Sequence, residues 1–393
     1  MRAGPSQEEI RRQNLGALLR YVHIHGATSR AELTTSLGLN RSTIGALTAE
    51  LTAAGLVSER APRAAGRAGR PSLVVRPESD RVYAYAYSIE VDRLRVARIG
   101  LGGVVLDRRE TARPPGLLAE DSLPLLAGFV KEMHQSVVDG SVYVGSGVAV
   151  CGRLRRQDGA VHLRPDSGWV DKPLGDALGE DLFPDRPILV GNAAGVSAVA
   201  EHARGAAAGY DNVIYLHRDV GIDAGIIVGG RRLTGQGGHG GEVGHMVVHP
   251  GGRPCDCGSH GCWETEIGDH ALLHAAGAGG AVGREAAFRV VDAAAQGDAN
   301  AQAAVRQVGD WLGFGVANLV NIFNPGVVIF GGTLREVYLA AAARIRSRLN
   351  SMALPAAREQ VRLRTPQLGE DVTLIGAAEL AFEHLLADPL DAG

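Results

Sequence analysis

No stretch of this 393-residue chain approaches the roughly 18 consecutive apolar residues that a membrane-spanning helix needs. The first ten residues, Met1–Ile10, are polar and mixed in charge, and they lack the apolar core of a secretion signal. Repeats and low-complexity segments are missing as well. We therefore expect a protein with no membrane partner, and we expect the cytoplasm as its compartment.

Cysteine is also scarce, with four residues in the whole chain. A cytoplasmic protein gains little from disulfides, so this count does not predict a disulfide framework. Three of the cysteines nevertheless fall close together, at Cys255, Cys257 and Cys262. Such clustering indicates metal or redox chemistry.

The chain has the composition of an ordinary globular protein, with 45% hydrophobic and 21% charged residues. Its length suggests two or three domains. The net charge of −3 hides an asymmetry, because the first 78 residues carry 11 arginines and 6 acidic residues while the remainder carries 29 basic and 37 acidic residues. A basic head on an acidic body favours contact with nucleic acid, although charge alone also fits a solvated basic face.

The first 78 residues, called the head below, contain three predicted helices. Apolar spacing predicts helices over Gln7–His25, Arg30–Leu37 and Arg41–Ala54. Thr28 or Ser29 is expected to cap the second helix, and Asn40 the third. Two helices joined by a short glycine turn are typical of a helix-turn-helix.

The third predicted helix would place its first residues against DNA bases. These residues are Arg41, Ser42 and Thr43, and all three can hydrogen-bond to bases or phosphates. A helix entering the major groove in this way is the usual mode of the helix-turn-helix.

Two short strands are predicted after that helix, at Val57–Glu59 and Leu73–Arg76. The loop between them carries Arg63, Arg67 and Arg70, which suit phosphate or minor-groove contact. This hairpin would be the wing of a winged helix-turn-helix DNA-binding domain covering residues 1–78. The alternative is a helical bundle that binds a protein.

Strand and helix signals alternate beyond residue 79, which predicts an α/β architecture for residues 79–393. Within this region lies a His-x9-Cys-x-Cys-x4-Cys pattern formed by His245, Cys255, Cys257 and Cys262. Three thiolates and one imidazole make a closed tetrahedral zinc set, which is a structural rather than a catalytic site. The alternative is a group of free thiols beside an unrelated histidine. Three further histidines nearby are alternative candidate ligands: His239, His249 and His260.

The block from Gly241 to His245, followed by Cys255 to Glu264, closely resembles the ROK family of sugar kinases and sugar-responsive repressors. The resemblance covers essentially the whole chain, since the repressor branch carries an N-terminal winged helix. It implies an actin-like (ribonuclease H-like, sugar-kinase-type) fold of two lobes. The first lobe would span about 79–193 plus the C-terminal helix at about 374–387, and the second, with the zinc loop, about 194–373.

The same resemblance implies a set of sugar-binding residues. His245 would touch the sugar as well as the metal, and Glu242 and Glu264 would hold sugar hydroxyls. Asn192 retains an amide that can bind a sugar, and Asp166 stands where the family usually has an amide. The acid at that place favours a ligand that presents hydroxyls or an amine. The alternative for Glu242 and Glu264 is a pair of ordinary loop acids.

Two parts of the kinase apparatus of the family are altered. Its Asp-x-Gly-Gly-Thr phosphate cradle is matched here by Ser88, Glu90 and Val91 at the Asp and Gly positions. Its general base, an Asp after Asn192, is matched by Ala193, which cannot accept a proton. We therefore expect no enzymatic activity.

Together these patterns predict a sugar-responsive transcriptional regulator, most simply a repressor of carbohydrate uptake or catabolism genes. It would bind double-stranded operator DNA as a homo-oligomer, a dimer or a tetramer, and contain one structural Zn²⁺. The alternative functions are a ROK sugar kinase with an added regulatory head and a DNA-binding protein that senses no ligand.

Overall fold

A computed structural model describes most of the chain, in two compact units. Unit 1 comprises residues 1–149, 173–191 and 374–393, and unit 2 comprises residues 150–172 and 192–373. The described residues are 6–61, 72–114, 117, 119–151, 153–154, 160–162, 172–173, 178, 186, 188–219, 221–280 and 283–391.

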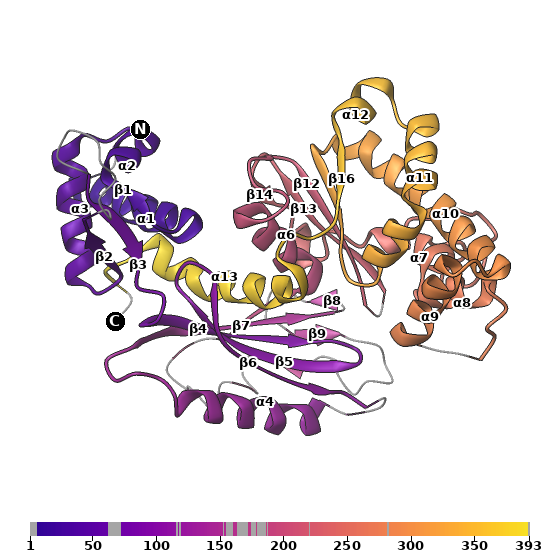
Figure 1. The fold of residues 1–393 in the computed structure, drawn as a ribbon, viewed down its shortest axis with the longest axis horizontal. Coiled ribbons are helices and arrows are strands. Elements are labelled where there is room, and N and C mark those ends of the chain that lie inside the picture. Colours follow the sequence, from indigo (N-terminus) through magenta and orange to yellow (C-terminus); the bar gives the residue numbers. More distant parts are fainter. Residues whose placement is uncertain are drawn as a thin grey trace. The chain divides into compact units, whose positions relative to one another are not determined.

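The head of unit 1 is a winged helix-turn-helix (Figure 1). Ser29 caps the second helix by accepting from the Glu32 amide, and Asn40 caps the third by accepting from the Thr43 amide. Gly38, at φ +65°, makes the turn between these helices. The elements of the head are α1 (Gln7–His25), β1 (Thr28–Ser29), α2 (Arg30–Leu37), α3 (Arg41–Ala53), β2 (Val57–Arg60) and β3 (Val74–Pro77).

A five-stranded sheet forms the rest of unit 1, with strand order β11-β7-β4-β5-β6; β4 and β6 are both antiparallel to β5. Helix α4 covers one face and helix α13 the other (Figure 1). Gly147 in β7 allows α13 to come close, since a Cβ there would lie 1.8 Å from the Ala377 carbonyl oxygen. The elements are β4 (Val82–Ile89), β5 (Arg93–Gly100), β6 (Val104–Ala112), α4 (Ala119–His134), β7 (Val142–Val150), β11 (Ile188–Asn192) and α13 (Val372–Ala387).

The head packs directly on α13. His23 of α1 is fully buried, and its Nε2 lies 3.1 Å from both carboxylate oxygens of Glu379. Its Nδ1 accepts from the Gly102 amide at 2.9 Å, so Nε2 carries the proton and donates to Glu379. Arg12 adds an ion pair with Asp388 at 3.4 Å. The winged helix and the first sheet therefore belong to one compact body, and the predicted division after residue 78 stays a prediction.

A second five-stranded sheet, in the order β14-β13-β12-β15-β16, is the centre of unit 2. Strands β12, β15 and β16 run parallel, whereas β13 is antiparallel to β12. Helix α6 packs on β12 and β13. These elements are α6 (Ala193–Arg204), β12 (Val213–Arg218), β13 (Ile222–Val228), β14 (Arg231–Arg232), β15 (Val327–Phe330) and β16 (Arg362–Arg364).

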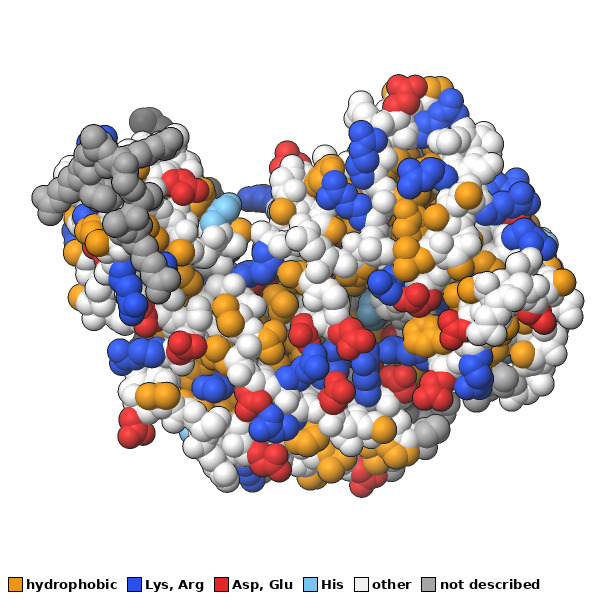
Figure 2. All heavy atoms as spheres, viewed as in Figure 1, with side chains coloured by type: hydrophobic (Ala, Val, Ile, Leu, Met, Phe, Trp, Pro, Cys, Tyr) orange, Lys and Arg blue, Asp and Glu red, His pale blue; other side chains and the backbone are white. Residues whose placement is uncertain are grey.

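Helices α10 and α11 complete the main core of unit 2 with β12, β13 and β15. Arginines gather on the face of these helices that is seen in Figure 2, and Arg344 and Arg348 of α11 both pair with Asp310 of α10. The remaining helices of unit 2 are η2 (Gln236–Gly238), η3 (Val243–His245), α7 (Trp263–Ile267), α8 (Asp269–Ala275), α9 (Arg284–Ala295), α10 (Ala299–Phe323), α11 (Leu334–Met352), α12 (Pro355–Gln360) and η4 (Gly369–Asp371).

A small sheet is formed by β8 (Arg153–Leu154), β9 (Ala160–His162) and β10 (Lys172–Pro173). The α/β fold class with an N-terminal winged helix-turn-helix is confirmed. In the described part of the chain, no helix has both the length and the apolar character to cross a membrane.

Candidate functional site

The predicted base-reading residues all lie in the first turn of α3. Arg41 and Ser42 are exposed and Thr43 is half-buried. The opposite face of the helix is anchored by Ile44, which is completely buried. The Ser42 hydroxyl donates to the Asn40 side chain at 2.7 Å, so the cap and the exposed turn are held together. This turn is therefore available to a partner while the helix stays fixed to the head.

The two strands of the predicted wing are described. Strands β2 and β3 pair in antiparallel register from Val57 opposite Pro77 to Arg60 opposite Val74. The predicted phosphate-contacting residues Arg63, Arg67 and Arg70 lie outside the described residues. Their contribution stays a prediction.

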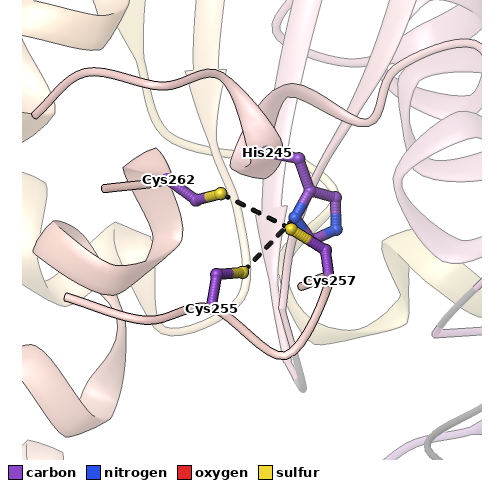
Figure 3. A group of neighbouring side chains, drawn as sticks. All are labelled: His245, Cys255, Cys257 and Cys262. Atoms are coloured by element: carbon purple, nitrogen blue, oxygen red, sulfur yellow. Dashed lines mark hydrogen bonds between the residues drawn. The ribbon is translucent and has the colours of Figure 1, made fainter. Parts of the chain in front are cut away.

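Four potential metal ligands converge in the loop between η3 and α7. The ligand atoms of His245, Cys255, Cys257 and Cys262 all lie within 4.8 Å of one another (Figure 3). The Cys257 and Cys262 sulfurs are 3.6 Å apart, and the Cys255 sulfur is 3.7 Å from His245 Nδ1. The cluster matches the four residues predicted from the sequence.

These separations fit a tetrahedral ion. Zinc–sulfur bonds of about 2.3 Å at tetrahedral angles place the sulfurs roughly 3.8 Å apart. The observed separation of 3.6 Å is close to this value. The protonation of the thiols also favours a bound metal. Burial raises the pKa of the Cys255 and Cys262 thiols, so without a cation their thiolate forms are costly. A bound divalent cation would offset that cost by stabilising the thiolates.

The three alternative histidines are not part of this group. His249 Nδ1 lies 3.1 Å from Glu266, and its ring stacks on Trp311. His239 and His260 are absent from the cluster that the described residues form. His245 is therefore the histidine that the geometry selects.

A buried tryptophan holds the metal loop in place. Trp263 follows Cys262 directly, is completely buried, and donates from Nε1 to the Trp311 carbonyl at 2.8 Å. Gly315 in α10 makes room for its ring, because a Cβ there would lie 2.0 Å from a ring carbon. The sequence reasoning did not find this anchor, although a tryptophan next to a ligand cysteine was visible.

Two carboxylates flank His245. Glu264 Oε1 lies 3.5 Å from His245 Nδ1 and accepts from the Cys255 thiol at 2.8 Å. Glu242 Oε2 lies 3.8 Å from His245 Nε2. Nδ1 therefore faces the cysteines while Nε2 faces Glu242, so one imidazole can serve a metal and a second group at once.

A small hollow in unit 2 lies beside this histidine. It is lined by Asn192, Asp223, Ala224 and Glu242, together with Gly238, Gly240 and Gly241. Asn192 caps α6 by accepting from the Ala194 and Gly195 amides, and its own amide donates to Asp223 at 3.2 Å. The sequence reasoning named Asn192 and Glu242 but missed Asp223 as a lining residue. Asp166, also predicted to contact the sugar, lies outside the described residues.

Two positions at which this chain differs from the kinases of the family, Ala193 and Glu90, are buried in the structure. Ala193 is the first residue of α6 and is buried, with no group that accepts a proton. In unit 1, the Glu90 carboxylate is buried and pairs with Arg93 and Arg95. The negative charge of Glu90 is thus compensated by two arginines.

A second ion-pair group lies at the glycine turn after β12. Arg218 is buried and pairs with Asp269, while Asp219 pairs with Arg284 at 2.9 Å. Burial, followed by the nearby Arg284, lowers the pKa of Arg218 to about 9, so its guanidinium remains charged at neutral pH. These partners come from distant segments, and spacing along the chain could not reveal them.

The chain is similar to known proteins over most of its length. The family model described as the ROK family matches residues 86–384. The chain belongs to the ROK family. A xylose repressor from Bacillus spizizenii is 27% identical over 97% of each chain, and a glucokinase from Halalkalibacterium halodurans is 29% identical over 78% of this chain and 96% of its own.

Among solved structures, the ROK chain is similar to a ROK family transcriptional regulator described as a homologue of the E. coli MLC protein. The TM-score is 0.77 at 26% identity, and the match covers 97% of this chain and 98% of the other. The regulator thus matches both the winged head and the two-lobed domain, whereas the glucokinase leaves about a fifth of this chain without a counterpart.

Proposed function

We propose that this ROK protein is a sugar-responsive transcriptional repressor that binds operator DNA and regulates genes of carbohydrate uptake or catabolism. The observation that carries the proposal is the near-complete mutual coverage with a xylose repressor, 97% of each chain, in a protein that also has a winged helix-turn-helix. The hollow beside His245 supports the sensing half of the proposal.

DNA contact is assigned to the exposed first turn of α3 and to the wing. Arg41, Ser42 and Thr43 would read base edges in the major groove. Arg63, Arg67 and Arg70 would contact phosphates or the minor groove. Operators that bind such heads are usually palindromic, so a homodimer would present two heads with matching symmetry.

Sugar contact is assigned to Asn192, Glu242, His245 and Glu264, with Asp166 as a further candidate. Amide, carboxylate and imidazole groups can all hydrogen-bond to sugar hydroxyls. The ligand regulates DNA binding only if it binds two conformations of the protein with different affinity. Contact with the sugar would thereby shift the population of the state that holds the operator.

A structural zinc ion is assigned to His245, Cys255, Cys257 and Cys262. Four protein ligands leave no open coordination position, so the ion would stabilise the loop rather than activate water. The role of this chain's residues is to fix His245, so that Nε2 keeps its orientation toward Glu242.

Catalysis is not part of the proposal. Phosphoryl transfer requires a base to orient the sugar hydroxyl, and Ala193 supplies none. The alternative of a sugar kinase with an added head rests on the glucokinase relatives.

Operator binding tests the first half of the proposal. Selection from random duplex DNA should recover a sequence that full-length protein binds, and Arg41→Ala should weaken binding and reduce its dependence on salt. Arg306→Ala is the matched control, since Arg306 is an exposed arginine outside the head. Failure to enrich any sequence, or equal salt slopes for the two variants, would overturn the DNA assignment.

A ligand screen tests the second half. Thermal shift against aldopentoses, aldohexoses and amino sugars should find a stabilising sugar, with D-xylose as the first probe because of the repressor relative. The same sugar should change operator affinity. If no sugar in the screen alters either quantity, the protein is a DNA binder that does not sense sugars.

A further inference from the structure

A buried carboxylate lies next to the metal loop, the segment from His245 to Cys262 that carries the four predicted ligands. Glu266 belongs to α7, which begins directly after Cys262, and only 4% of the residue is exposed. A buried carboxylate is costly unless it has strong partners, so its partners indicate what it does. Glu266 is not one of the four clustered ligands, and it is not among the described residues that line the hollow beside His245.

Both oxygens of Glu266 bind the segment that joins the first two ligands, His245 and Cys255. Oε1 accepts from His249 Nδ1 at 3.1 Å, and Oε2 accepts from the Arg253 guanidinium at 2.9 Å. An ionised carboxylate can only accept, so Nδ1 of His249 carries the proton. One side chain of α7 therefore fixes this segment at two separate points.

Backbone hydrogen bonds tie the same two points to the residue before the last ligand. The Gly261 carbonyl accepts from the His249 amide at 3.1 Å, and the Gly261 amide donates to the Arg253 carbonyl at 2.8 Å. Only glycine fits here, because its φ is +69° and a Cβ would lie 1.7 Å from the His249 carbonyl oxygen. Cys262 follows directly, so the position of this ligand depends on the segment that Glu266 anchors.

The ring of His249 is also held by a helix of the core. It stacks on Trp311 of α10, with the ring centroids 5.4 Å apart and the planes 19° from parallel. The Trp311 carbonyl accepts from Trp263, which follows Cys262. His249 thus has two partners that fix its ring, although about half of its side chain is exposed.

We propose that Glu266 is a positioning residue of the metal loop. It holds the segment between His245 and Cys255 in the conformation that binds the ion, and it thereby slows release of the ion. Ligands bind a metal tightly when they are already arranged for it, and groups that orient them typically contribute roughly ten- to a hundredfold to metal affinity. This inference rests on the proposed zinc site.

The test measures how fast zinc leaves the folded protein. Full-length protein with its zinc bound is mixed with an excess of a chromogenic zinc chelator, and release is followed by absorbance. Glu266→Gln should accelerate release about tenfold, because the amide NH2 of glutamine cannot accept and one of the two donors loses its partner. The control is Glu285→Gln, which removes the same charge from an exposed position on α9 and should leave the rate unchanged.

A second variant tests the same contact from its exposed side. His249→Phe keeps a ring against Trp311 but removes the donor to Glu266, and it should accelerate release several-fold. Melting temperatures of the zinc-loaded variants are measured alongside. A residue that only stabilised the fold would lower the melting temperature and leave the release rate of the folded protein unchanged.

The outcomes separate the inference from the zinc site on which it rests. Release from Glu266→Gln at the wild-type rate overturns the proposal, as does equal acceleration in Glu285→Gln. If Glu266→Gln does not fold, His249→Phe decides, and an unchanged rate in that variant overturns the proposal. Wild-type protein that binds no zinc refutes the metal site itself, and the inference falls with it.

Discussion

At the scale of single residues, the three cysteines of the metal loop differ in burial and in the pKa of their thiols. Cys257 is exposed, and the backbone hydrogen bond from Ser259 lowers the pKa of its thiol, whereas burial raises the pKa of Cys255 and Cys262. A loop with such unlike thiols gains from an ion that binds all of them as thiolates.

We predict that freshly purified protein contains about one zinc ion per chain and that Cys257→Ser loses it. The melting temperature should fall by several degrees, because metal binding contributes to folding free energy. Mass spectrometry of metals and calorimetry measure the two effects. Cys151→Ser, outside the cluster, is the control; equal zinc content in both variants would refute the site.

At the scale of elements, α13 links distant parts of unit 1. Its residues contact the head through Glu379 and Asp388, and it lies against the first sheet at Ala377. The boundary between the two units falls after Thr373, within its first turn. Helix α13 therefore contacts both the head and the first sheet of unit 1.

His23→Phe is predicted to loosen the head from α13. Phenylalanine fills similar volume but removes the imidazole partner of the Glu379 carboxylate and of the Gly102 amide, at a cost of about 2–3 kcal/mol. Chemical denaturation measures the loss. Adding Glu379→Leu should recover part of it, since the buried charge goes too; strictly additive losses would contradict the coupling.

The contact between α10 and α11 should depend on pH. Burial acts to raise the pKa of Asp310, but hydrogen bonds from Arg348 and Arg344 outweigh it and leave the pKa below its usual value. A lowered native pKa means that the stabilisation is present above the unfolded pKa of about 3.9 and is lost as pH falls through the native value.

Asp310→Asn should therefore lower the free energy of unfolding near pH 7 by about 0.5–1 kcal/mol. The deficit should begin to shrink as the pH falls below about 4, where the carboxylate of the unfolded chain protonates, and should vanish once the pH falls below the lower native pKa. Urea unfolding across this range measures it. Arg346→Gln removes an exposed charge from the same helix and should show no such pH dependence.

At the scale of the whole molecule, both units carry changes at positions that the family resemblance assigns to phosphoryl transfer, so a single substitution should not create kinase activity. Ala193 lies in unit 2, and the Glu90 group lies in unit 1. We predict that Ala193→Asp produces no ADP above background in a coupled assay with Mg-ATP and D-glucose or D-xylose, because the Glu90 ion pairs remain. Measurable turnover would show that the alanine alone had silenced the enzyme.

Local patterns determined much of this protein before its structure was known. The helices of the head follow from apolar spacing and from the caps Ser29 and Asn40, which act within a few residues. The metal ligands were equally visible, since a short loop forces Cys255, Cys257 and Cys262 together. In α2, by contrast, Ala31 is exposed and Leu33 is buried, because apolar spacing in one short helix does not fix which side faces the core.

Only tertiary structure decided which distant groups meet. The partners His23 and Glu379 are 356 positions apart, and Arg218 at the end of β12 pairs with Asp269 at the start of α8. Asp223 of β13 and Glu242 line one hollow although they are distant along the chain. The sequence gives the chemical type of each side chain. How the chain packs decides which side chains are buried and which partners they contact, because these contacts join residues that are far apart in the sequence.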